Sequence, residues 1–89
     1  MNDTHILVVE DEHICIAFIE RTLAAKGLAF TTANSCAEAL RHLENQHIEF
    51  DAILLDRGLP DQDGLVFLRQ LKATPAWQGI PVIVETASA

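Results

Sequence analysis

Three carboxylates fall within nine residues of this chain, in the stretch DRGLPDQDG at residues 56–64, and three more are consecutive in EDE at residues 10–12. Each stretch directly follows a short apolar run, at residues 52–55 and 6–9. Carboxylates held close together repel one another unless a divalent cation neutralises them. Because Mg²⁺ accepts one or two carboxylates, a backbone carbonyl and water as ligands, the two stretches predict a magnesium site.

The spacing after Asp56 indicates a shaped loop, because glycine and proline favour particular turn conformations. The residues concerned follow Asp56 by two, four and eight positions and are Gly58, Pro60 and Gly64. Helix capping is a second explanation for the acidic residues, since a carboxylate at a strand end often caps the next helix. Capping alone would account for Asp11 or Asp63, so the choice between a cap and a metal ligand stays open for each residue taken singly.

Strands and helices are predicted to alternate along the chain. Short apolar runs predict strands at residues 6–9, 28–33, 50–55 and 80–84, with Pro81 confined to the start of the last one. Apolar residues at helical spacing predict a helix over residues 14–26, with Gly27 as its C-terminal cap. A second helix follows the Ser35 and Glu38 capping box, and a third carries Leu65, Leu68 and Leu71 and ends before Pro75.

This β-α-β-α-β-α-β order predicts an α/β fold with a parallel sheet and right-handed crossovers. The carboxyl ends of parallel strands meet at one edge of the sheet, where open α/β folds bind their ligands. If the first and third strands are neighbours, Asp11 and Asp56 face each other across a crevice, with Glu10 close by. The predicted fold thus brings the two acidic stretches together.

Length and composition limit what the chain can do. Its 89 residues suffice for one small domain, and 49% hydrophobic residues predict a folded core. A net charge of −7 disfavours binding to nucleic acid or to an anionic membrane surface. The N-terminus lacks a signal peptide and no stretch is long and apolar enough to span a membrane, so we expect a cytoplasmic protein. The cysteine and histidine spacing does not predict a zinc site.

Three motifs together resemble the receiver domain of two-component response regulators. They are LVVEDE at residues 7–12, LLDRGLPDQDG at residues 54–64 and PVIVETA at residues 81–87. They occur in the family's order and spacing, and the resemblance covers essentially all 89 residues. It implies a flavodoxin-like, doubly wound parallel sheet, in agreement with the element order.

The resemblance also implies roles for individual residues. Asp56 matches the phosphoacceptor, Asp11 the direct Mg²⁺ ligand, and Glu10 the acidic partner that acts through a metal-bound water. Gly58 would offer its backbone carbonyl to the same ion, and Thr86 would hydrogen-bond the phosphoryl group. The positions that tune the lifetime of the acyl phosphate or the size of the entrance are Gly58, Ala87 and Ser88.

The activity implied is phosphoryl transfer from a sensor histidine kinase or a phosphotransfer protein onto Asp56, with Mg²⁺ as cofactor. Charge screening and in-line positioning would do most of the catalysis, because a carboxylate attacks a dianionic phosphoryl group poorly. The chain would then be a signalling switch that phosphorylates and dephosphorylates itself, rather than an enzyme that turns over a substrate. The added charge near the Thr86 hydroxyl would trigger the switch.

The chain also departs from the family pattern. A receiver runs to about 120 residues, so residues 1–89 are expected to form a receiver domain truncated after the fourth strand, without the fourth helix, the fifth strand and the fifth helix. Neither lysine, Lys26 or Lys72, matches the invariant lysine of the fifth strand. An apolar edge at residues 82–84 and an uncovered sheet face would then be exposed, which predicts a homodimer or larger species.

Three alternatives were weighed against this assignment. A phosphatase of the haloacid dehalogenase type wants a second aspartate two residues after the nucleophile, where this chain has Gly58. An EF-hand calcium loop placed on Asp61 and Asp63 would put its first ligand on Leu59 and its last on Gln70, so it fails at both ends. A receiver-like interaction or dimerisation module that is not phosphorylated remains the main alternative, because the lysine is missing.

Overall fold

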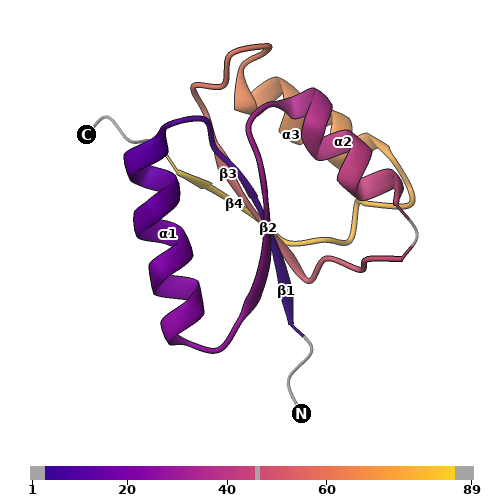
Figure 1. Ribbon diagram of the computed structural model, residues 1–89. Helices are drawn as coiled ribbons and strands as arrows, with labels where there is room; N and C mark the ends of the chain where they lie inside the picture. The colour runs from indigo at the N-terminus through magenta and orange to yellow at the C-terminus, as the bar shows by residue number, and fades with distance from the viewer. Residues whose placement is uncertain (1–3, 46, 86–89) are drawn as a thin grey trace.

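A computed structural model describes residues 4–45 and 47–85 of the chain. Strands and helices alternate in it from end to end (Figure 1). The elements are β1 (His5–Val9), α1 (His13–Ala25), β2 (Ala29–Ala33), α2 (Cys36–Glu44), β3 (Ala52–Asp56), α3 (Gly64–Ala73) and β4 (Val82–Glu85).

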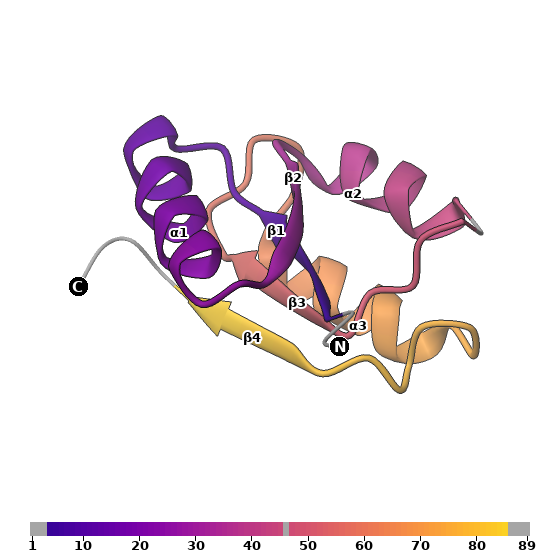
Figure 2. The same ribbon diagram turned by 60° about the horizontal axis from the view of Figure 1, so that its bottom comes forward.

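The four strands form one parallel sheet in the order β2-β1-β3-β4. Figures 1 and 2 show α1 on one face of the sheet and α2 and α3 on the other. Helices on both faces make the sheet doubly wound, which confirms the predicted α/β fold. The strand order also confirms that β1 and β3 are neighbours, the condition on which the acidic crevice depended.

The apolar run of β1 is continuous because both faces of the strand are covered. Leu7 and Val9 pack in the larger core, on the side of α2 and α3, around the fully buried Phe67. Ile6 and Val8 point to the opposite face and pack against Leu23 of α1. The central strands therefore sit between two apolar layers, which fixes the edge from which the acidic residues emerge.

The face covered by α1 is only partly closed. Glu20 of α1 accepts a hydrogen bond from Thr32 of β2, so that flank of the helix lies toward β2. On α1, Ile14 and Phe18 are 79% and 70% exposed, and Ile83 of the edge strand β4 is 55% exposed. The predicted apolar edge is therefore reduced to Ile83, because Val82 and Val84 pack against the larger core.

Two strands begin two residues later than the sequence predicted. β3 begins at Ala52 rather than at residue 50, although Phe50 is buried and meets the ring of His5 edge-on at 5.1 Å. β4 begins at Val82 rather than at residue 80. Pro81 has no N–H for the ladder and contributes only its carbonyl, which accepts from Ile53 N at 2.9 Å.

Candidate functional site

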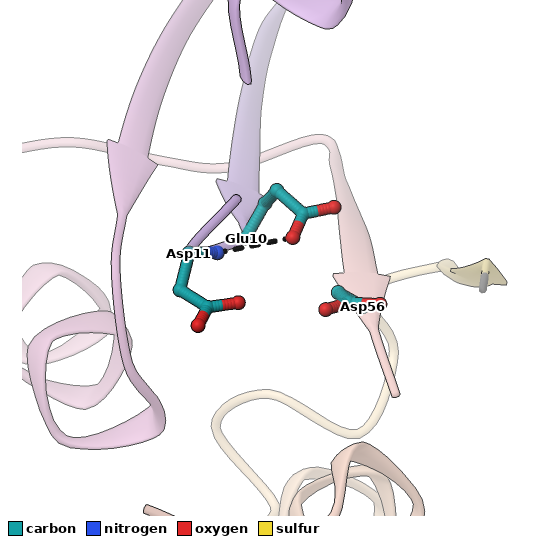
Figure 3. Close-up of side chains that lie close together, drawn as sticks. All are labelled: Glu10, Asp11 and Asp56. Atoms are coloured by element: carbon teal, nitrogen blue, oxygen red, sulfur yellow. Dashed lines mark hydrogen bonds between the residues drawn. The ribbon is translucent and has the colours of Figure 1, made fainter. Parts of the chain in front are cut away.

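Three carboxylates meet at the carboxyl edge of the sheet. The register pairs Val9 of β1 with Leu55 of β3, so Glu10 and Asp56, the next residue of each chain segment, lie side by side. Carboxylate oxygens of Glu10, Asp11 and Asp56 all lie within 4.8 Å of one another. Figure 3 shows the three side chains around a common space, two of them from the end of β1 and one from the end of β3.

Burial differs among the three residues. Glu10 is 2% exposed and Asp56 is 6% exposed, whereas Asp11 is open to solvent. Glu10 Oε2 accepts hydrogen bonds from the backbone amides of Asp11 at 3.1 Å and Glu12 at 3.2 Å. These two bonds fold the Glu10 side chain back over the turn that leads into α1. The site therefore has a buried pair, Glu10 and Asp56, and one exposed carboxylate, Asp11.

Burial raises the pKa of Glu10 above its ordinary value of 4.5, and the nearby charge of Asp56 raises it further. The backbone amides of Glu12 and Asp11 oppose this rise in pKa, but they do not cancel it. Because the folded-state pKa of Glu10 is raised, the stability that Glu10 contributes is fully present below pH 4.5. This stability is lost as the pH rises through the folded-state pKa. At neutral pH the cluster thus carries charge repulsion that a cation would relieve.

Replacing this charge tests the electrostatic description. Without divalent cations, Glu10→Gln should raise the free energy of unfolding at pH 7 by about 1 to 3 kcal/mol, because it removes repulsion from Asp56. The gain should shrink below pH 4.5, where the native carboxyl is also neutral. Urea denaturation at both pH values measures the difference, and the exposed Glu49 gives the control variant Glu49→Gln. A gain as large in acid as at pH 7 would contradict this description.

The loop after Asp56 is fastened at its base. Gly64 N donates to Arg57 O at 2.8 Å, and Gly58 and Asp63 form an isolated antiparallel bridge. The Asp63 side chain accepts from Leu65 N at 2.9 Å as the N-cap of α3, which confirms the capping role considered for it. A Cβ built on Gly58 would lie 3.9 Å from Asp56 Oδ2, so Gly58 lies beside the Asp56 carboxylate.

The other predicted cap is absent. The N-cap residue of α1 is Glu12 and makes no side-chain capping bond, so Asp11 does not cap this helix. Three predicted site residues, Thr86, Ala87 and Ser88, lie outside the described residues. The last described residue, Glu85, pairs with Asp56 in the sheet, so the end of β4 reaches the same edge.

Both lysines lie away from the acidic cluster. Lys26 is the C-cap of α1, at the opposite end of that helix from Asp11. Lys72 donates to the carbonyls of Gln78 at 3.3 Å and Ile80 at 3.0 Å, in the segment that enters β4. Neither lysine is therefore placed at the carboxyl edge.

A separate pocket lies at the other edge of the sheet, before β3 and β4 begin. It has a volume of about 420 Å³, and Trp77, Phe50 and Ile80 form part of its wall. Trp77 also packs against the larger core. None of the three clustered carboxylates lines this pocket.

Asp61 makes a contact that the sequence does not indicate. The carboxylate of Asp61, in the loop after β3, accepts two hydrogen bonds from backbone amides at the start of α2. The partners are 25 and 24 positions upstream, so no local motif indicates the contact.

The chain matches the response regulator receiver domain family over residues 6–89. The chain belongs to this receiver domain family. Helices long and apolar enough to cross a membrane do not occur in the receiver domain over the described ranges 4–45 and 47–85.

Curated relatives of the receiver domain include bacterial and plant response regulators. It is 38% identical over 84 residues to the KDP operon transcriptional regulatory protein KdpE of Escherichia coli, covering 94% of this chain and 35% of KdpE. It is 29% identical over 87 residues to the two-component response regulator ORR8 of Oryza sativa, covering 98% of this chain and 71% of ORR8. The chain thus spans about a third of the length of KdpE.

Solved structures agree with the flavodoxin-like fold. The phosphorylated cyanobacterial phytochrome response regulator RcpA superposes with a TM-score of 0.89 at 31% identity, covering 98% of this chain and 67% of that one. The receiver domain of sensor histidine kinase PA1611 from Pseudomonas aeruginosa gives a TM-score of 0.87 at 34% identity, covering 99% and 70%. The PA1611 structure has a magnesium ion coordinated in its active-site cleft.

Proposed function

We propose that this receiver domain accepts a phosphoryl group on Asp56 from a histidine kinase or a phosphotransfer protein, in a Mg²⁺-dependent reaction that switches a signalling output. The proposal rests on the carboxylate oxygens of Glu10, Asp11 and Asp56, which lie within 4.8 Å of one another at the carboxyl edge of the sheet. Such a cluster is costly without a cation and has the oxygen ligands that Mg²⁺ prefers. The magnesium ion of the PA1611 receiver domain supports the same assignment.

The residues present fit this cation. Asp11 and Asp56 would bind it directly, Gly58 would add its backbone carbonyl, and Glu10 would act through a bound water. Glu10 suits the indirect role because one of its oxygens already accepts from two backbone amides. A bound Mg²⁺ supplies the positive charge that screens the carboxylates from the oxygens of the incoming phosphoryl group.

In the proposed step, one carboxylate oxygen of Asp56 forms a bond to the phosphorus of a phosphohistidine on the donor. The phosphorus–nitrogen bond breaks, its electron pair stays on the imidazole nitrogen, and that nitrogen takes a proton from solvent. Asp56 is thereby converted into an aspartyl phosphate, and the unphosphorylated donor dissociates. From the family resemblance, we assign Thr86 to the hydrogen bond with the phosphoryl group. Gly58 and Ser88 are assigned to tuning the lifetime of the product, and Ala87 to keeping the entrance small.

Intact mass spectrometry after incubation with acetyl phosphate tests this function. The protein should gain one phosphate when Mg²⁺ is present and none when a chelator removes it. A gain that does not depend on Mg²⁺ would contradict the metal assignment. If the protein neither gains phosphate nor binds Mg²⁺ in a calorimetric titration, the interaction-only alternative replaces this proposal.

We also propose that the chain forms a homodimer through β4 or through the sheet face beside α1. The exposed side chains of Ile14, Phe18 and Ile83 support this proposal, because burying them removes apolar surface from water. Analytical ultracentrifugation should show a dimer or larger species that dissociates on dilution, and Ile83→Lys should shift it toward monomer. A monomer at every concentration would contradict the prediction.

A further inference from the structure

The loop at residues 57–63 contacts a second helix besides the one that it leads into. Asp61 Oδ1 accepts from Cys36 N at 3.0 Å, and Asp61 Oδ2 accepts from Ala37 N at 3.0 Å. Cys36 and Ala37 are the first two residues of α2, whose free amides carry partial positive charge. One carboxylate thus joins two connections that are far apart in sequence.

α2 has a complete local cap in addition to this contact. Ser35 Oγ accepts from Glu38 N at 3.1 Å, and Glu38 Oε1 accepts from Asn34 N at 2.8 Å. This capping box leaves the amides of Cys36 and Ala37 for Asp61. The hydrogen bond from Cys36 N, and then that from Ala37 N, lowers the pKa of Asp61, so its carboxylate remains ionised in this place at neutral pH.

The position of this contact in the sheet relates it to the acidic site. α2 follows β2, the loop follows β3, and β1 lies between those two strands. A bond from the loop to the start of α2 therefore spans the end of β1, where Glu10 and Asp11 emerge. At its base the same loop places Gly58 beside the carboxylate of Asp56.

Most other bonds of the loop act at its base. They are the Gly64 N to Arg57 O bond, the Gly58 and Asp63 bridge and an Arg57 to Asp63 ion pair at 3.6 Å. This ion pair joins two exposed side chains and contributes little. Beyond the base, Leu59 is buried in the larger core and Asp61 bonds α2. Gln62 Nε2 donates to Gln70 Oε1 of α3 at 3.1 Å, a hydrogen bond between exposed side chains. Asp61 is thus the residue that ties the outer part of the loop to α2.

We propose that Asp61 is a positioning residue, which holds the loop after β3 against the first turn of α2 and thereby sets the Mg²⁺ affinity of the acidic site. This inference rests on the proposed function. Asp61 itself is too far along the loop to be assigned as a ligand, and it acts through the backbone that carries Gly58.

The experiment compares Asp61→Ala with Ser35→Ala. Both variants remove hydrogen bonds from the first turn of α2, but only Asp61→Ala detaches the loop. Without Mg²⁺, amide hydrogen exchange at Gly64 should be faster in Asp61→Ala and unchanged in Ser35→Ala, since the Gly64 amide bond closes the loop. Calorimetry should show the Mg²⁺ dissociation constant raised about 3- to 10-fold in Asp61→Ala and unchanged in Ser35→Ala. This loss of affinity is smaller than that expected on removing a direct hydrogen-bond partner of a metal ligand.

Asp61→Asn is the second variant, because it keeps one acceptor oxygen and much of the shape, and it should give intermediate values. Equal effects of Ser35→Ala and Asp61→Ala on both measurements would overturn the inference and leave Asp61 as a helix cap. If the unmodified protein does not bind Mg²⁺, the proposed function fails. The exchange comparison at Gly64 then still decides whether Asp61 anchors the loop.

Discussion

Replacing Asp56 by asparagine is expected to abolish phosphate uptake from acetyl phosphate and, without Mg²⁺, to raise the free energy of unfolding by about 1 to 3 kcal/mol. The two effects have one cause. Asp56 is 6% exposed and its oxygens lie within 4.8 Å of those of Glu10 and Asp11, so its negative charge opposes folding. The same charge makes its carboxylate the proposed nucleophile and metal ligand.

Intact mass spectrometry measures the first effect and urea denaturation the second. Adding Mg²⁺ should stabilise the unmodified protein in proportion to ligand saturation, and should stabilise Asp56→Asn less. Glu49→Gln removes an exposed carboxylate from the opposite edge of the sheet and should change neither phosphate uptake nor the response to Mg²⁺. An Asp56→Asn variant that still gains phosphate, or that is less stable than the unmodified protein without Mg²⁺, would contradict the assignment.

Replacing Gly64 by alanine is expected to lower stability by about 1 to 3 kcal/mol or more. A Cβ at this position would lie 2.5 Å from the carbonyl oxygen of Asp56 and 2.8 Å from Cα of Arg57. Both contacts are with backbone atoms, which cannot rotate away. The start of α3 must then move away from the end of β3, and the 2.8 Å bond from Gly64 N to Arg57 O weakens.

Because this shift occurs beside Asp56, the rate of phosphate uptake should also fall about 10- to 100-fold. Gly79→Ala is the matched control, since a Cβ there meets no atom within 4 Å and the backbone has no left-handed angle. Chemical denaturation and time-resolved mass spectrometry give the two quantities. Equal stability and equal rates in Gly64→Ala and Gly79→Ala would show that the close packing at Gly64 does not constrain the site.

The parts of the fold that could be predicted from the sequence are those set by local pattern. The apolar runs of β1 and β3 are short, continuous and followed at once by acidic residues, which is typical of strands covered on both faces. Parallel pairing then brings Glu10 and Asp56 to one edge without further information. The capping box of Ser35 and Glu38 is likewise a local signal, and the structure confirms it.

The parts that could not be predicted depend on contacts between distant segments. Phenylalanine is a residue type that is common in strands, so Phe50 was predicted to lie in one. It is instead buried by its contact with His5 and the core rather than by strand pairing. The Asp61 contact joins residues 25 and 24 positions apart, and its partners are backbone amides, which leave no trace in the side-chain pattern. Asp63 shows the opposite case, since its cap is two residues away and local reasoning found it.

Asp56, rather than a neighbouring carboxylate, is expected to receive the phosphoryl group. Reduction of the phosphorylated protein with borohydride converts an acyl phosphate into an alcohol, and peptide mass spectrometry then locates the modified residue. Modification is expected at Asp56 alone, and only after phosphorylation with Mg²⁺ present. Modification at Glu10 or Asp11 instead, or none anywhere in a protein that binds Mg²⁺, would contradict it.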